Sequence, residues 1–346
     1  MRAVVLRGER DVAVEEVPDA VVPGSDGLLL RVERTAICGS DLHLYHSPLV
    51  PGCRLGHEFV GTVEEVGPGV RSVRAGDRVL VSGVIGCGRC PACLAGDVVT
   101  CHSSGTRVFG TSLDLPGGQA EAVGVPAADA SVVAIPEEIT LDQAVLLTDI
   151  LPTGYLGAQR ADITPGDVVV VIGLGPVGVF ALQCAQLYGP SRVLAVDVVP
   201  ERLARAADLG AEPIDANQGS TVDQVLAATG GRGAPAVIEA VGADQTITDA
   251  IHCAAPGGTV SVIGVSMNFS LPFPMPVALF KRLTFRVTLA AIPATWQALL
   301  PLVASGRLHP EDVFTHRMGL SQAAEAYDLF DARRDGVLKV LLDPAS

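Results

Sequence analysis

Four cysteines lie close together in the segment CGRCPACLAGDVVTC, with the spacing C-x2-C-x2-C-x7-C, and they are Cys87, Cys90, Cys93 and Cys101. Four thiolates in one short loop can surround a zinc ion tetrahedrally and leave no coordination position open, which is a structural role. An iron–sulfur cluster also takes four cysteines, but nothing else in the sequence indicates electron transfer. The spacing predicts a structural zinc site, so any reaction needs a second centre.

A second set of candidate ligands is spread along the chain. Cys38 in ICGSDLHLYH and His57 in LGHEF stand beside the turn residues Gly39 and Gly56, where a scaffold can present ligands. Asp149 in LLTDILPTGY is the only ionisable group among apolar neighbours, and burying it unpaired would be costly. It can cap a helix, or it can complete an open zinc site with the other two. The spacing leaves both interpretations open.

A third candidate site is the motif GLGPVG, which matches GxGxxG through Gly173, Gly175 and Gly178. It follows the apolar run VVVVI, begins a helix, and is followed by Asp197 at the end of RVLAVD. In a dinucleotide-binding unit the glycines allow the turn, the approach of the pyrophosphate and close packing of helix on strand. Asp197 would accept hydrogen bonds from the adenosine ribose and repel a 2′-phosphate, which favours NAD over NADP.

These residues fall in two differently patterned regions. Residues 1–150 show short alternating strands separated by Gly, Pro and Asp, which is typical of a β-rich, barrel-like domain. Residues 151–290 alternate strands with helices, which predicts a parallel, doubly wound sheet. Residues 291–346 are too few for a domain of their own and are expected to return to the first. The predicted class is α/β, with Pro152 and Gly154 turning the chain between the domains.

Composition narrows the function classes. The chain has 346 residues and a formal net charge of -14, which argues against partners that are polyanions, such as nucleic acids and anionic membrane surfaces. The uncharged run at 168–182 is interrupted by glycine and proline and is too short to cross a bilayer. The start, MRAVVLRGER, lacks the apolar core of a signal peptide, so we expect a cytoplasmic protein.

The motifs CGSDLHLYH, GHE, the four-cysteine segment, DILPTGY and GLGPVG occur here in the order found in the zinc-dependent medium-chain alcohol dehydrogenases. The chain resembles that family from about residue 38 to 200. The resemblance implies a GroES-like catalytic domain, with a structural zinc lobe at about 86–102, and a Rossmann domain that binds NAD. It also implies two zinc ions per chain.

The resemblance assigns roles around the catalytic zinc. Cys38, His57 and Asp149 look like its ligands. Glu58 resembles the family's carboxylate that can approach the metal during ligand exchange, and Asp41 resembles the residue that hydrogen-bonds the ligand histidine and fixes its tautomer.

Further residues match the family's proton and cofactor contacts. Ser40 resembles the hydroxyl that receives the alcohol proton, and His43 the base that hands it toward solvent. Thr153 and Val177 look like the side chains that press on the nicotinamide, and Arg202 like a contact to the adenosine ribose. Lys339 is expected to bind the pyrophosphate, and Gly39 stands where some members carry an arginine for it.

The resemblance implies an NAD-linked oxidoreductase that interconverts an alcohol and an aldehyde or ketone, as a homodimer or homotetramer. Asp149 and DILPTGY point to the branch of formaldehyde dehydrogenases and bacterial secondary-alcohol dehydrogenases. One alternative is an aldehyde dismutase that retains NAD through its cycle. Another is a non-catalytic NAD or zinc sensor, which we expect to lack Ser40, His43 or a ligand of the open site.

Overall fold

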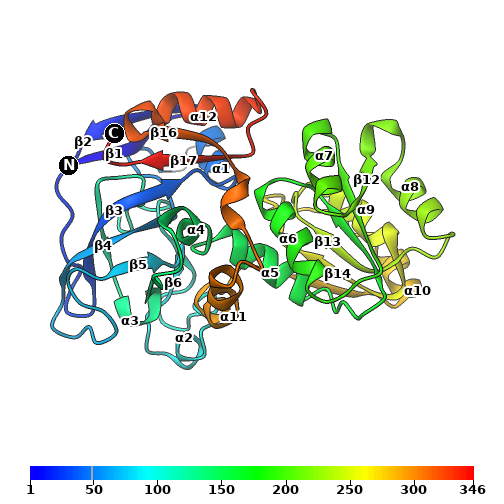
Figure 1. The fold of residues 1–346 in the computed structure, drawn as a ribbon, viewed down its shortest axis with the longest axis horizontal. Coiled ribbons are helices and arrows are strands. Elements are labelled where there is room, and N and C mark those ends of the chain that lie inside the picture. The colour runs from blue at the N-terminus through cyan, green and yellow to red at the C-terminus, as the bar shows by residue number, and fades with distance from the viewer. Residues whose placement is uncertain (48–49) are drawn as a thin grey trace. The chain divides into compact units, whose positions relative to one another are not determined.

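The structure is a computed structural model that describes residues 1–47 and 50–346. The chain forms two compact units. One contains Met1–Pro152 together with Ala290–Ser346, and the other contains Thr153–Leu289. Figure 1 shows the two units, with the blue N-terminal strands and the red C-terminal strand in the same one.

The first unit is built mainly from β-strands. Its larger sheet has the order β16-β17-β3-β4-β5-β9, with β8 also paired to β3, and β1 and β2 form a separate hairpin. The bounds from the N-terminal side are β1 Arg2–Gly8, β2 Asp11–Glu16, β3 Leu28–Ala36, β4 Glu58–Val66, β5 Arg78–Val81, β6 Val84–Ile85, β7 Arg107–Val108, β8 Ala122–Val125 and β9 Val132–Ala134. Its helices there are short: α1 Asp41–His46, α2 Pro91–Leu94, α3 Ala128–Ser131 and α4 Leu141–Leu146.

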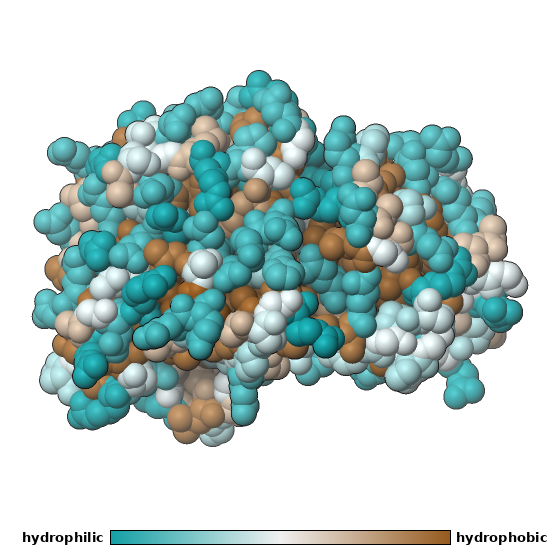
Figure 2. All heavy atoms as spheres, in the orientation of Figure 1, coloured by the Kyte–Doolittle hydropathy of each residue, from teal (hydrophilic) through white to brown (hydrophobic). Residues whose placement is uncertain are grey.

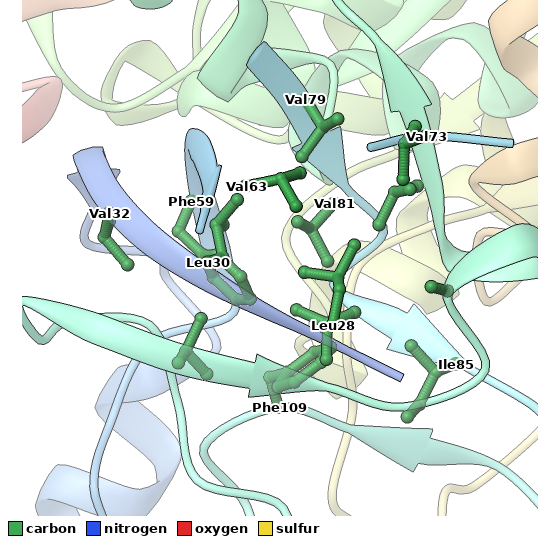
Figure 3. Packing of buried hydrophobic residues seen from close by; sticks show 14 of the residues in the cluster. Leu28, Leu30, Val32, Phe59, Val63, Val73, Val79, Val81, Ile85 and Phe109 are labelled. Atoms are coloured by element: carbon green, nitrogen blue, oxygen red, sulfur yellow. The ribbon is translucent and has the colours of Figure 1, made fainter. Parts of the chain in front are cut away.

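Apolar residues of these strands and of the segments between them form a buried core, which includes Leu28, Leu30, Phe59, Val79 and Phe109 (Figure 3). The rings of Phe59 and Phe109 meet edge to face, 5.1 Å apart. Such a pair adds about 0.5–1.5 kcal/mol beyond the burial of its area. Since Phe59 lies near the start of β4, this core fixes the strand that begins immediately after His57.

The C-terminal segment completes the same sheet. Strand β17 pairs antiparallel with the end of β3, where Leu341 lies opposite Ala36. Helix α12 contacts β2, β16 and β17. The bounds are α11 Pro293–Ala304, η2 Pro310–Val313, β16 Phe314–Gly319, η3 Leu320–Gln322, α12 Ala323–Ala332 and β17 Lys339–Asp343. Residues from near the end of the chain therefore lie beside those just before Cys38.

The second unit contains a parallel six-stranded sheet with the order β12-β11-β10-β13-β14-β15. This is the doubly wound arrangement that the alternation predicts, and its order reverses between β10 and β13, where such sheets bind ligands. Helix α5, Ile150–Gln159, begins in the first unit and ends in the second. The other elements are β10 Val168–Ile172, α6 Pro176–Gln186, β11 Arg192–Asp197, α7 Pro200–Asp208, β12 Glu212–Asp215, η1 Ala216–Gln218, α8 Thr221–Ala228, β13 Ala234–Glu239, α9 Asp244–Cys253, β14 Ala254–Val262, α10 Met275–Lys281 and β15 Thr284–Val287.

One local expectation is wrong. Pro152 and Gly154 do not turn the chain, because both lie inside helix α5. Proline is tolerated in the first turn of a helix, where its missing N–H has no partner to lose. Gly154 is required by packing, since a Cβ there would meet Phe180 Cβ at 2.7 Å.

The visible face is largely hydrophilic, with smaller hydrophobic patches between (Figure 2). Within the described ranges, no helix combines the length and the apolar character needed to traverse a lipid bilayer.

Candidate active site and zinc centres

Cys38, His57 and Asp149 come together in the first unit, although 111 residues separate the first from the last. The Cys38 thiol lies 3.3 Å from Asp149 Oδ2, and His57 Nε2 lies 3.3 Å from the same oxygen. Cys38 follows the end of β3, His57 precedes β4, and Asp149 directly precedes α5, so each stands where a regular element begins or ends. Asp149 is therefore placed both at a helix start and among the other two candidate ligands.

The donor set fits zinc in chemistry and spacing. Sulfur, imidazole nitrogen and carboxylate oxygen are the ligands zinc takes, and tetrahedral coordination puts such atoms roughly 3.3–3.6 Å apart. The observed separations agree with that. Burial and the nearby Asp149 carboxylate raise the pKa of the Cys38 thiol to about 11. Burial thus opposes the thiolate form of Cys38, whereas a bound cation would favour the thiolate and release its proton.

Asp41 holds His57 in the orientation a ligand needs. Its Oδ1 lies 3.1 Å from His57 Nδ1, and its Oδ2 accepts from the backbone N–H of Cys38 at 3.0 Å. The carboxylate requires the proton on Nδ1, so the Nε2 lone pair faces the candidate metal position. Although burial disfavours the charged ring, Asp41, Cys38 and Asp149 hold the pKa of His57 well above its ordinary value.

Two buried polar residues near Asp41 were not among the predicted site residues. Gln119 donates from Nε2 to Asp41 Oδ2 at 3.3 Å, and the Tyr327 hydroxyl donates to Gln119 Oε1 at 2.9 Å. Both side chains are completely buried. The only sequence signal for Gln119 was its place in GGQAEA, between turn glycines and a strand, and Tyr327 had none.

Ser40, the first member of the predicted proton relay, lies beside the candidate zinc ligands. The Ser40 hydroxyl is 3.2 Å from Cys38 Sγ and 3.3 Å from His57 Nε2. His43 lies on α1, one turn further along, and its side chain reaches solvent. Partial desolvation, with a smaller contribution from the nearby His46, lowers its pKa. Its backbone N–H donates to the Ser40 carbonyl, and the described atoms include no side-chain hydrogen bond between the two. A relay between them stays a prediction.

The resemblance implied that Lys339 binds the cofactor pyrophosphate, but the structure places this residue elsewhere. Its side chain is completely buried, and its ammonium forms a 2.5 Å ion pair with Glu58 Oε1. Burial opposes the charge, but the Glu58 carboxylate outweighs it and raises the pKa of Lys339. An ammonium enclosed in this way cannot reach a cofactor phosphate, so the expected pyrophosphate contact is corrected to a structural ion pair with Glu58.

Glu58 is the fourth member of the ligand cluster. One donor atom from each of Cys38, His57, Glu58 and Asp149 lies within 4.8 Å of the others. Glu58 Oε2 is buried and has no hydrogen-bond partner among the described residues. A carboxylate oxygen left without a donor beside these ligands fits a position near a cation.

The four cysteines also come together, within 4.8 Å of one another, and are free thiols. Cys90 Sγ lies 3.5 Å from Cys93 Sγ, near the roughly 3.8 Å expected for two ligands of tetrahedral zinc. Hydrogen bonds from Ser104 lower the pKa of Cys101 to about 5. Burial raises the pKa of Cys93 to about 12. This loop, with α2 inside it, fits a closed structural zinc site.

In the second unit the three motif glycines occupy distinct environments. Gly173 has φ +90°, which favours glycine, and a Cβ on Gly178 would meet the Gly173 carbonyl oxygen at 1.8 Å. Gly175 caps α6, and a Cβ there would have only Arg202 Nη1 near it, at 3.9 Å. One glycine makes the turn, one packs helix on strand, and the third leaves open space before a helix N-terminus, which suits a pyrophosphate.

Asp197 ends β11, the strand beside β10. Its Oδ2 accepts from the Leu174 N–H of the glycine loop at 2.6 Å and lies 3.8 Å from Arg202 Nη1. The predicted nicotinamide contacts lie in the same unit, Thr153 in α5 and Val177 in the first turn of α6. Asp197 therefore supports the glycine loop, and its contact with the adenosine ribose stays a prediction.

The comparisons with known proteins agree with this arrangement. Residues 24–137 match the alcohol dehydrogenase GroES-like domain, and residues 176–305 match the zinc-binding dehydrogenase family. A zinc-binding alcohol dehydrogenase of Mycobacterium tuberculosis is 48% identical over 100% of this chain and 89% of its own length. The alcohol dehydrogenase of Thermus sp. ATN1 is 43% identical, with TM-score 0.93 over 99% of both chains.

A zinc-binding dehydrogenase of Sinorhizobium meliloti 1021, solved with NADP, is 30% identical, with TM-score 0.85 over 99% of both chains. The similarity thus covers both units, including the residues of both candidate zinc sites. The chain belongs to the zinc-dependent medium-chain alcohol dehydrogenase family.

Proposed function

We propose that this protein is a zinc-dependent, NAD-linked alcohol dehydrogenase that interconverts an alcohol and an aldehyde or ketone. One observation carries the proposal: Cys38, His57 and Asp149 converge in a mostly buried cluster that has the Ser40 hydroxyl beside it. Because the Glu58 carboxylate is already paired with Lys339, we assign the ligand role to the other three residues. Three ligands of this kind leave one zinc position for a substrate, which distinguishes a catalytic from a structural site.

Bound at these three residues, zinc supplies a Lewis acid that lowers the pKa of an alcohol, and NAD in the second unit supplies the hydride acceptor. Ser40 accepts the alcohol proton, because its hydroxyl lies within 3.3 Å of two ligand atoms. The exposed His43 passes that proton to solvent. Asp41 keeps the proton of His57 on Nδ1 throughout.

The same proposal includes a preference for NAD over NADP. Asp197 is buried at the end of β11, and its carboxylate would face the adenosine ribose. A second negative group at the 2′ position would be repelled there. Arg202, 3.8 Å from this carboxylate, would contact the ribose from the other side.

We also propose that the protein self-associates as a homodimer or homotetramer. Four large apolar side chains, Met275, Leu279, Phe280 and Val287, are exposed on α10 and β15 of the second unit. Because β15 is the last strand in the order of its sheet, its outer edge has backbone groups open to a further strand. An apolar surface beside an open edge suits a second copy of the same chain.

The test is a panel of primary, secondary and polyol alcohols, followed by nicotinamide absorbance, in parallel with metal analysis. We expect turnover with added NAD and two zinc ions per chain, and we expect Asp149→Asn to lose one zinc and its activity together. Full activity with both metals in that variant would refute the ligand assignment. Disproportionation of an aldehyde without added NAD, by protein carrying bound NAD, would indicate a dismutase instead.

A further inference from the structure

A buried path of hydrogen bonds runs from the C-terminal helix α12 to the candidate ligand His57. Tyr327 donates to Gln119, Gln119 donates to Asp41, and Asp41 accepts from His57 Nδ1. We propose that Gln119 and Tyr327 are positioning residues that hold His57 and Cys38 in the geometry that binds the catalytic zinc. This inference rests on the proposed zinc site.

Gln119 holds the backbone just before both candidate ligands. Its side-chain amide donates to the Ala36 carbonyl at 3.2 Å, two residues before Cys38. Its own backbone N–H donates to the Leu55 carbonyl at 3.0 Å, two residues before His57. One buried residue therefore links the ends of two chain segments that must stay in register for their ligands to meet.

The contact with the second segment is close. Gly56, which precedes His57, has φ +97°, and a Cβ there would lie 2.4 Å from Gln119 Cγ. The Gln119 side chain thus lies directly against the backbone of that glycine. A displacement of Gln119 would move the peptide that leads into His57.

Counting donors and acceptors shows why the hydroxyl of Tyr327 matters. The two N–H groups of the Gln119 amide go to Ala36 and Asp41, and its oxygen accepts from Tyr327. Every polar atom of the amide is used, and the reverse orientation would set its oxygen against two acceptors. Without the hydroxyl, that oxygen would be a buried acceptor with no donor, which favours a shift of the amide away from Asp41.

Tyr327 is fixed by its packing, so it can act as an anchor. It is fully buried, in a hydrophobic cluster that joins α12 to β1 and β17, and its ring lies 5.4 Å from that of Tyr45. Tyr45 comes from α1, which begins three residues after Cys38, but it takes no part in the path. Tyr45→Phe is therefore a matched control that removes a nearby phenol hydroxyl.

The experiment measures zinc release from the holoenzyme to a chromogenic chelator. The four-cysteine site provides an internal reference, and the phase missing in Asp149→Asn identifies the catalytic zinc. We expect Gln119→Leu to speed release of the catalytic zinc about tenfold, the usual cost of losing a partner behind a metal ligand. Tyr327→Phe should speed it roughly threefold, since only one acceptor loses its donor. Release from the four cysteines should not change.

Three results would count against the inference. Wild-type release rates in Tyr327→Phe would show that the hydroxyl does not position the ligands. Because Tyr327→Phe keeps the buried ring, it still tests the inference if Gln119→Leu fails to fold. Equal acceleration at both zinc sites, or in Tyr45→Phe, would indicate general loosening. A wild-type chain with only the four-cysteine zinc would refute the proposed catalytic site itself, which metal analysis detects before any variant is made.

Discussion

Lys339 and Glu58 form an ion pair whose two side chains are both completely buried. Removing one partner of such a pair leaves an uncompensated charge and typically costs about 3–5 kcal/mol. Lys339→Met should therefore lower the thermal unfolding temperature strongly. The double variant with Glu58→Gln should recover much of the loss, because no lone charge remains. Differential scanning calorimetry of the zinc-loaded protein measures both, and equal stability of the single variant and the wild type would contradict the account.

Asp197 gives a second prediction for a single residue. Its Oδ1 accepts from the N–H groups of Val198 and Val199, and its Oδ2 accepts from Leu174. Asp197→Asn keeps the shape while removing the charge, so we expect the ratio of kcat/KM for NADP to that for NAD to rise about tenfold, the equivalent of ~1.4 kcal/mol.

The ratio is the informative quantity, because looser loop packing would affect both cofactors alike. Asp208→Asn, an exposed change in α7 of the same unit, is the control for loss of one negative charge. A wild-type enzyme that already prefers NADP would overturn the ribose argument.

The residues that could be predicted as neighbours are those set close together by short motifs. Cys38, Ser40 and Asp41 lie just after the end of β3, and His57 directly precedes β4, the strand that pairs with β3. The placement of Gln119 and Tyr327 beside Asp41, and the pairing of Lys339 with Glu58, could not be predicted, because isolated polar residues buried among apolar ones leave no periodic pattern in the sequence. Their partners lie 78, 208 and 281 residues away.

At the scale of elements, two glycine variants of the β10–α6 turn should separate the effect on thermal stability from the effect on cofactor binding. Gly178→Ala would place a Cβ 1.8 Å from the Gly173 oxygen, so we expect a marked drop in thermal stability. Gly175→Ala meets nothing closer than 3.9 Å, so stability should hold while the Kd for NAD rises. Thermal unfolding without cofactor and calorimetric titration with NAD separate the two effects. Tight NAD binding by Gly175→Ala would show that the open space does not receive the pyrophosphate.

Helix α5 shows that proline and glycine in a sequence do not always mark the end of a helix. Proline and glycine in DILPTGY indicate a turn, because each usually interrupts a helix. Here Pro152 falls in the first turn, and Gly154 allows α5 to approach Phe180 of α6. By contrast, Ser220 caps α8 by accepting a hydrogen bond from the Asp223 N–H, and a serine three residues before an acidic residue is a local sequence signal for such a cap. A cap of this kind can be recognised from neighbouring residues, whereas the need for glycine at position 154 comes from a tertiary contact.

For the whole molecule, the exposed apolar side chains of α10 and β15 give a test of self-association. Phe280 is 84% exposed in the single chain. If this surface binds a second copy, Phe280→Asp should introduce a carboxylate into the interface, where it would face either the same carboxylate of the second copy or apolar side chains. Both contacts are unfavourable, so the assembly should dissociate at micromolar concentration.

Light scattering coupled to size-exclusion chromatography measures the mass directly. Leu113→Asp, at an exposed apolar residue of the first unit, is the control for adding a charge. An assembly that is unchanged by Phe280→Asp would place the contact elsewhere on the molecule.

The first unit is assembled from both ends of the chain, since β17 pairs with β3 while the second unit lies between them in sequence. On a ribosome, Thr153–Leu289 is complete and free to fold while β3 still lacks the strand that will cover its end. Cys38, His57 and Asp149 are then already synthesised, but Tyr327 and Lys339 are not. Zinc capture at these ligands should accordingly be one of the last events in the maturation of a newly made chain, later than folding of the domain that holds the nucleotide.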